Sequence, residues 1–162
     1  MTFTVSNYAG GQQIATKDTT QNHPLGTIVR GHDPTYGEGE FIYLKGVAST
    51  IAGSVVEYST SFQTGLATSA TTLSRPLAVS MTTTTGSYYG WYQIGGIAQV
   101  AKATSLSLVA DAYIGAAAGL AIAAASGKRI NGAQVAVVAS AISGTAPDTV
   151  SVMINRPTDS YI

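Results

Sequence analysis

The sequence predicts an all-β protein: a small β-barrel or sandwich of short strands with a long, mostly irregular N-terminal arm. Three observations support this fold class. Segments rich in β-branched and aromatic residues recur from Phe41 onward, separated by turn-forming residues. The C-terminal segment alternates with a period of two, because other side chains separate Val150, Val152 and Ile154. The chain has no cysteine, so packing and strand pairing must stabilise the fold without disulfides.

The first 40 residues form the predicted arm. Turn-forming residues interrupt them repeatedly, and only residues 27–29 resemble a strand. Irregular segments of this length are usually functional or disordered, and an arm that wraps a neighbouring subunit and becomes ordered on assembly fits both descriptions. We therefore divide the chain into an extended arm, residues 1–40, and a β-barrel-like domain, residues 41–162.

The domain is predicted to consist of short strands. Paired glycines at 95–96 interrupt the most aromatic segment and predict a bulge or a sharp bend, which is how small sheets curl towards a barrel. The strands are expected at residues 41–47, 54–59, 64–67, 76–81, 88–94, 97–101, 132–139 and 149–154.

Residues 109–126 are compatible with two structures. Their many alanines favour a helix, because alanine has the highest helix propensity. Two glycines oppose a helix, since each destabilises it by about 1 kcal/mol relative to alanine. We favour a hairpin in which residues 112–116 and 120–123 are joined by a turn at Ala118 and Gly119.

Charged residues make up only 10% of the chain, and eight basic and eight acidic residues cancel. The usual share in soluble proteins is about 25%. No basic stripe is present, so we expect no direct nucleic-acid partner. The longest apolar stretch, residues 112–125, is shorter than the ~20 residues that cross a bilayer, so we expect no membrane partner either. A neutral surface with few charges tends to associate, which predicts an oligomer or a component of an assembly.

Few residues are suited to catalysis or metal binding. Both histidines, His23 and His32, lie in the predicted arm near Asp33, Glu38 and Glu40. Their spacing fits no common metal-ligand pattern, so we interpret them as solvated loop residues. The sequence also lacks a phosphate-binding loop and the Gly-x-Ser-x-Gly turn of hydrolases. We therefore expect no enzymatic activity, no cofactor and no metal.

Aromatic residues concentrate between positions 88 and 92. Strand alternation places Tyr89 and Trp91 on one face and the other two tyrosines partly on the opposite face. We expect one set to fill the core and the other to contact a partner, because Tyr and Trp are enriched at interfaces. A sugar-binding face is the alternative. The candidate interface residues are Tyr36, Phe41, Tyr88, Tyr89, Trp91 and Tyr92.

Several small-residue segments share a loose pattern of Gly, Ala, Asp and Val. They are residues 76–79, 96–100, 110–114, 132–136 and 148–152, with a lead-in at 24–31. In this pattern the chain resembles the small bacteriophage proteins that decorate, or cement, a capsid. The resemblance implies a β-barrel core that binds the major capsid protein on the outer surface of the head, often as a homotrimer, after synthesis in the host cytoplasm. It implies no catalytic residues. Alternatives are a tail tube subunit, the base of a head fibre, or a carbohydrate-binding module.

Overall fold

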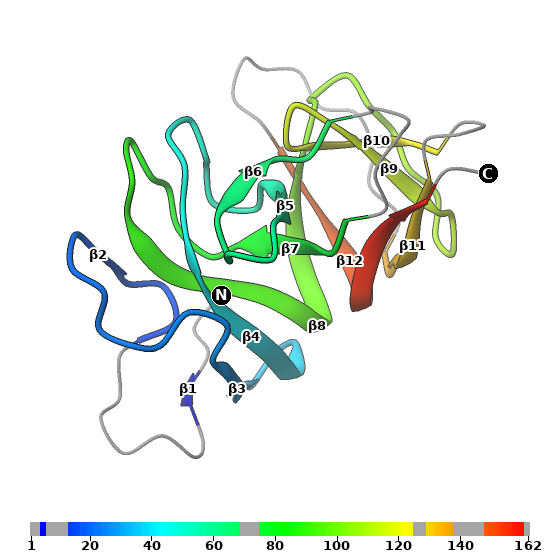
Figure 1. Ribbon diagram of the computed structural model, residues 1–162. Helices are drawn as coiled ribbons and strands as arrows, with labels where there is room; N and C mark the ends of the chain where they lie inside the picture. Colours follow the sequence, from blue (N-terminus) through cyan, green and yellow to red (C-terminus); the bar gives the residue numbers. More distant parts are fainter. Residues whose placement is uncertain (1–3, 6–12, 69–74, 125–128, 138–147, 161–162) are drawn as a thin grey trace.

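The structure, a computed structural model, describes residues 4–5, 13–68, 75–124, 129–137 and 148–160. These residues contain no helix, and their strands form one sheet (Figure 1), which confirms the all-β prediction. The strands are β1 (Thr4–Val5), β2 (Lys17–Asp18), β3 (Ile28–Asp33), β4 (Gly37–Lys45), β5 (Val55–Tyr58), β6 (Thr64–Leu66), β7 (Leu77–Ser80), β8 (Tyr89–Lys102), β9 (Ile114–Ala117), β10 (Leu120–Ala123), β11 (Arg129–Val135) and β12 (Asp148–Ser160).

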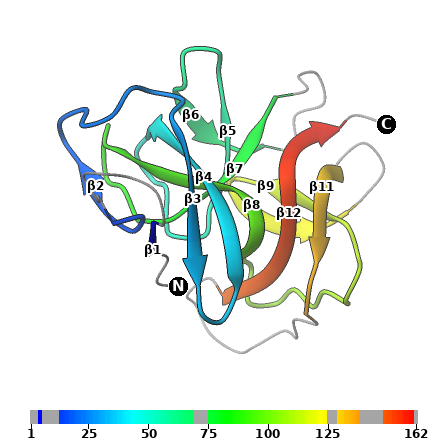
Figure 2. The same cartoon turned by 90° about the horizontal axis from the view of Figure 1, so that it is seen from below.

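Strand β8 organises the sheet. Its first half pairs with β4 and β7, and from these strands the sheet continues to β3 and β1 on one side and to β5 and β6 on the other. Its second half pairs with β12, which also pairs with β11 (Figure 2). The sheet is not closed into a barrel. The prediction of a barrel is therefore wrong, and the arrangement is consistent with the other predicted form, a sandwich of short strands.

The predicted irregularity at the paired glycines is a β-bulge. Glu40 of β4 pairs with Gly95, whereas Phe41 pairs with Gln93, so β8 carries one extra residue at this point. Gly96 has a positive φ of 91°, and a Cβ atom there would collide with the carbonyl oxygen of Glu38. Only glycine fits this position, because it tolerates both the left-handed conformation and the close approach of β4.

The alanine-rich segment is a hairpin, as favoured. Strands β9 and β10 pair antiparallel from Leu120–Ala117 to Ala123–Ile114. Both residues of the connecting turn have positive φ, 48° at Ala118 and 78° at Gly119. This is the backbone geometry of a type I′ turn, whose twist matches that of a two-stranded ribbon. The helix is excluded because tertiary pairing overrides the propensity of alanine.

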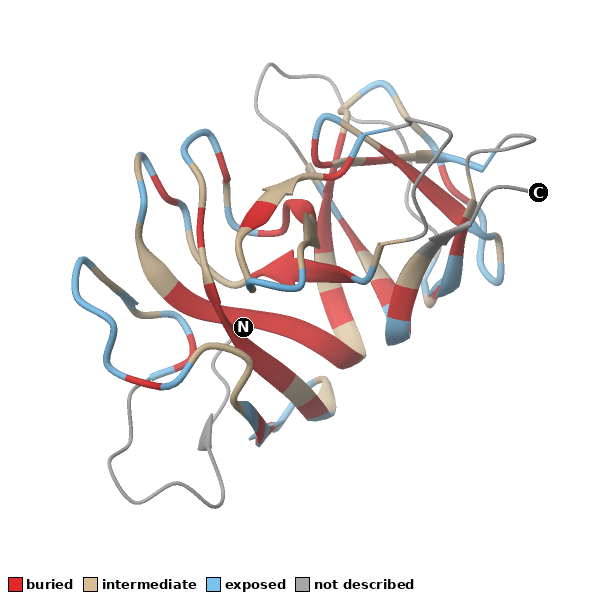
Figure 3. Cartoon of the chain, in the orientation of Figure 1, coloured by how far each residue is buried: buried red, intermediate tan, exposed pale blue. Residues whose placement is uncertain are grey.

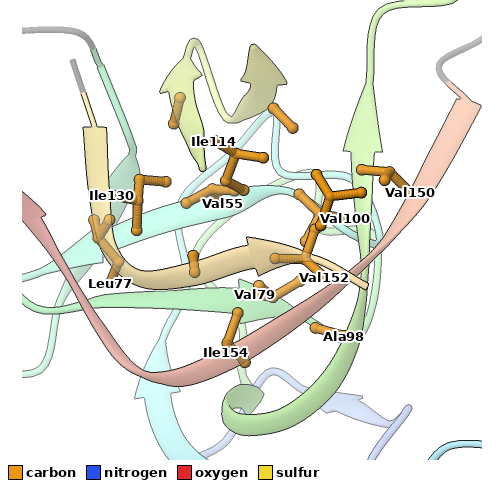
Figure 4. Packing of buried hydrophobic residues seen from close by; sticks show 14 of the residues in the cluster. Val55, Leu77, Val79, Ala98, Val100, Ile114, Ile130, Val150, Val152 and Ile154 are labelled. Carbon is orange, nitrogen blue, oxygen red and sulfur yellow. The ribbon is translucent and has the colours of Figure 1, made fainter. Parts of the chain in front are cut away.

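Buried residues concentrate along the central strands β4, β7 and β8 (Figure 3). Their side chains belong to three hydrophobic clusters. The largest, which we call the aliphatic core, contains only Val, Leu, Ile and Ala among its buried members and surrounds the second half of β8 (Figure 4). The other two, together called the aromatic core, involve alternate residues of β4 and β8. Phe41, Tyr43 and Trp91 belong to one of them, and Tyr92 belongs to the other with Ile42. Alternation of side chains along paired strands assigns the two clusters to opposite faces of the β4–β8 pair.

The predicted alternation of the C-terminal strand is confirmed. Val150, Val152 and Ile154 of β12 all point into the aliphatic core (Figure 4). Met153, between two of them, is 56% exposed.

The boundary between arm and domain is corrected, because residue 40 lies inside β4. Strand β3 pairs with β4 from Ile28–Ile42 to Asp33–Gly37, so residues 28–40 belong to the sheet. Ile14, upstream of this hairpin, is buried in the aromatic core. The sequence did not reveal the hairpin because its glycines and charged residues have low strand propensity. Its connecting turn is nevertheless well specified, since the Asp33 carboxylate accepts hydrogen bonds from the backbone amides of Thr35 and Tyr36.

Candidate functional site

The six predicted interface residues do not form one exposed surface. Phe41, Trp91 and Tyr92 are buried in the aromatic core, so their assignment to an interface is corrected. The physical reason is that β4 and β8 are central strands with hydrophobic clusters on both faces, which cover both alternating sets of side chains. The remaining residues of the set are partly exposed: Tyr36, Tyr88 and Tyr89.

The aromatic segment of β8 lacks the flat exposed face that sugar binding needs. Tyr89 and Trp91 contribute to the same cluster, as alternation predicted. Trp91, however, packs inside that cluster with its ring centroid 5.0 Å from that of Tyr43. Tyr88 is partly covered by Lys17, whose ammonium nitrogen lies 5.1 Å from the ring centroid. Two half-exposed tyrosines remain, and neither stands beside an exposed tryptophan.

The two histidines have different environments. His23 is buried, with its ring edge-on to Tyr43 at 5.0 Å and 5.3 Å from Trp91, so its interpretation as a solvated loop residue is corrected. His32 is exposed, and its Nδ1 lies 3.3 Å from the Glu38 carboxylate. In the described part of the chain, no group of three or more His, Asp or Glu side chains is placed to hold a metal ion.

Lys102, at the end of β8, is fully buried. Its ammonium lies 3.0 Å from the Asp148 carboxylate, at the start of β12, and donates a hydrogen bond to the carbonyl oxygen of Leu106 at 3.0 Å. A backbone hydrogen bond from Thr149 and the contact with Lys102 lower the pKa of Asp148. The pair therefore fastens β8 to β12 and to the loop that follows β8.

An open groove of about 570 Å3 lies between the start of β4 and β12. We call it the β4–β12 groove. Both strands pair with Gly95 of β8, so the bulge lies between them. Its apolar lining includes Tyr36, Ile97 and Met153, the last two being paired in register. An exposed methionine and a half-buried isoleucine next to backbone that glycine leaves uncovered are typical of contact surfaces rather than of reaction sites.

Charged side chains border the groove in cross-strand pairs. Arg30 of β3 lies opposite Glu40 of β4, and His32 lies opposite Glu38. The Glu40 carboxylate contacts two guanidinium groups: Arg30 at 3.1 Å through one oxygen, and Arg156 at 3.4 Å through the other. The two arginine side chains are 74% and 65% exposed, whereas that of Glu40 is 23% exposed. At this end of the groove, the guanidinium groups of Arg30 and Arg156 are therefore exposed to solvent, whereas the Glu40 carboxylate that they share is largely covered.

Arg156 has an unusual backbone conformation. Its φ is 42°, in the left-handed region that non-glycine residues seldom occupy. Such a conformation costs on the order of 1 kcal/mol or more, and it persists only where the surrounding structure imposes it. β12 passes at this point from its pairing with β8 to its pairing with β11 alone. The bend directs a charged side chain towards Glu40 across the end of the groove.

Sequence patterns gave little signal for this groove, although Tyr36 was among the predicted residues. Arg30 and Arg156 are far apart in the chain, and the hairpin that carries Arg30 was assigned to the arm. The Gly95–Gly96 bend was the one sequence feature that marked the location, because a bulge often adjoins a functional surface.

Comparison with protein families does not assign the chain. No family model matches it, and no curated protein matches it. Among the described residues, no helix has the length and apolar character needed to traverse a lipid bilayer.

Proposed function

We propose that this chain is a non-catalytic structural protein that binds a larger protein assembly, and that the assembly is a viral capsid whose outer surface it decorates. The proposal is based on the outer edge of β3, which has only a short strand partner among the described residues. Strand β1 pairs with this edge only at Gly31 and His32. Within the described residues, the stretch from Ile28 to Arg30 has no strand partner on that side.

An open sheet edge is a binding device. It presents unpaired backbone N–H and C=O groups in a row, and an extended segment of another protein can add to it as a further strand. β1 shows that the edge of β3 accepts an antiparallel strand from a distant part of the chain. Ile28, whose side chain is 46% exposed, supplies an apolar contact beside the backbone groups of this edge.

The composition of the chain suits this role. With 10% charged residues, few ions must lose their water when surfaces meet, so a large contact carries a small desolvation penalty. The resemblance to capsid decoration proteins supports a capsid as the assembly and a homotrimer as the oligomeric state. Binding would then come from many modest contacts across neighbouring capsid subunits.

Electron cryo-microscopy of particles of the virus that encodes the chain tests the proposal. We expect density with this fold on the outer surface of the head, contacting the major capsid protein. Density in the tail tube or at a fibre base would instead identify another virion component, and absence of the chain from the particles would refute the proposal. Light scattering after size-exclusion chromatography should show a trimer.

The contribution of the β3 edge can be tested by substitution. Ile28→Lys places a charge on the outer edge of β3, which should weaken co-sedimentation with heads that lack the protein by at least tenfold. Thr60→Lys, in an exposed turn at the opposite end of the sheet, is the matched control. Deletion of residues 1–12 removes β1 but retains Ile14 in the core, so it tests the arm without opening the fold. Unchanged binding of both edge variants would exclude strand addition at β3.

A further inference from the structure

We propose that the β4–β12 groove is a second contact site, which binds a carboxylate-bearing segment of a protein partner. The inference deepens the proposed function and rests on it only in requiring that the chain has a protein partner. In the bound state, a partner Asp or Glu side chain would pair with Arg30 and Arg156. A neighbouring apolar side chain would pack on Met153 and Ile97.

Charge at the arginine end favours a single carboxylate. Two guanidinium groups share one carboxylate, that of Glu40, so this end has one positive charge in excess. Arginine binds carboxylates through paired N–H donors, and neither guanidinium is fully used by Glu40, which receives the Arg30 Nε and Nη2 groups and one Arg156 Nη2. Both side chains are mostly exposed, so the remaining donors face solvent.

The rest of the groove disfavours polyanions. Glu38, whose side chain is 70% exposed, also lines the groove and adds a second carboxylate to it. The phosphates of a nucleic acid would be repelled by this carboxylate and by that of Glu40. An extended peptide with one acidic residue can pair that residue with the arginines and keep its remaining charge low. The apolar lining by Tyr36, Ile97 and Met153 further favours a peptide, because it offers a surface for an apolar side chain.

The backbone of Arg156 supports a binding role rather than a stabilising one. An exposed ion pair contributes about 0–1 kcal/mol to stability, which does not exceed the cost of a left-handed arginine. Glycine would occupy this conformation without strain. An arginine at this strained position is then explained by what its guanidinium contacts outside the chain.

Methyl NMR of the purified chain provides the test. The sequence has three methionines, of which Met153 lies in the groove and Met81 packs against the aromatic core. The probe is the blocked peptide Gly-Leu-Asp-Leu-Gly, and its matched control has Asn in place of Asp. We expect the Asp peptide to shift the Met153 methyl signal and leave that of Met81 in place. The Asn peptide should bind at least fivefold more weakly.

Substitutions separate binding from folding. Arg156→Gly should weaken peptide binding at least fivefold while leaving the melting temperature unchanged or higher. Arg75→Gln, which removes the comparable Arg75–Glu57 pair elsewhere on the surface, should leave binding unchanged. A Met153 signal that does not move, or that moves equally with the Asn peptide, would overturn the proposal, as would a response to inorganic phosphate but not to the Asp peptide. Because no capsid is used, these outcomes are independent of where the chain lies in a virion.

Discussion

The aliphatic core and the aromatic core are built on two halves of the same strand, β8, but they differ in side-chain size and in their relation to the surface. The aliphatic core packs small branched residues against alanines. At the end of β8, the buried Lys102 forms an ion pair with the partly exposed Asp148. The aromatic core packs Phe41, Tyr43 and Trp91 on one face of the β4–β8 pair and Tyr92 among aliphatic residues on the other. Burial raises the pKa of the Tyr43 and Tyr92 hydroxyls.

The difference between the two cores explains why the β4–β12 groove lies at the bulge of β8. The bulge at Gly95 and Gly96 lies where β8 changes its partners from β4 and β7 to β12. β4 and β12 meet at Gly95 from either side, and the groove opens there. The candidate site is thus a consequence of joining two differently packed regions through one bent strand.

The largest expected effect comes from the aromatic core. Trp91→Ala should lower the free energy of unfolding by about 3–5 kcal/mol, because it removes the largest fully buried side chain. Val152→Ala in the aliphatic core should cost about 2 kcal/mol, since it removes the equivalent of two buried methylene groups. Trp91→Phe is the control and should lose less, because the indole Nε1 has no hydrogen-bond partner in the described structure. Urea unfolding followed by circular dichroism measures all three, and equal losses for the two alanine variants would remove the distinction between the cores.

The junction between the cores should be the next most sensitive point. Gly96→Ala combines a positive φ with a collision against Glu38, whereas Gly37→Ala has a positive φ of 76° and no atom within 4 Å of the added Cβ. The control, Gly37→Ala, should lower the free energy of unfolding by about 1 kcal/mol, the usual penalty for a left-handed alanine. Gly96→Ala should lower it by at least about 1 kcal/mol more. Urea midpoints of the two variants give the comparison. Equal midpoints would contradict the close approach of β4 to the bulge.

The ion pair between Lys102 and Asp148 predicts a pH dependence of stability. The pKa of Asp148 is lower in the folded state than its ordinary value of 3.8, so the stabilisation is complete above about pH 4 and is lost as the pH falls below it. Asp148→Asn should therefore lower the melting temperature at pH 7, and the difference from the parent chain should shrink towards pH 2. Asp111→Asn, an exposed substitution, is the control. A difference that is constant with pH would show that the carboxylate charge is not involved.

The smallest effect is expected in the β9–β10 turn. Ala118→Asn should raise the melting temperature by a few degrees, because asparagine tolerates the left-handed conformation better than alanine and is favoured in type I′ turns. Ala117→Asn, within β9, should lower it instead. Differential scanning calorimetry resolves changes of this size, and a destabilised Ala118→Asn variant would argue against the I′ turn.

The sequence by itself determined the all-β class, most of the strands, the bend at the paired glycines and the hairpin at Ala118 and Gly119. These features are local: β-branched runs, alternation with a period of two, and glycine at positions of positive φ depend on neighbours along the chain. Only the tertiary structure decided that residues 28–40 belong to the sheet, that Phe41, Trp91 and Tyr92 are buried, and that Arg30 and Arg156 meet at Glu40. Those outcomes depend on which strands lie beside β4 and β8, and pairing partners distant in sequence leave no periodic signal in either segment.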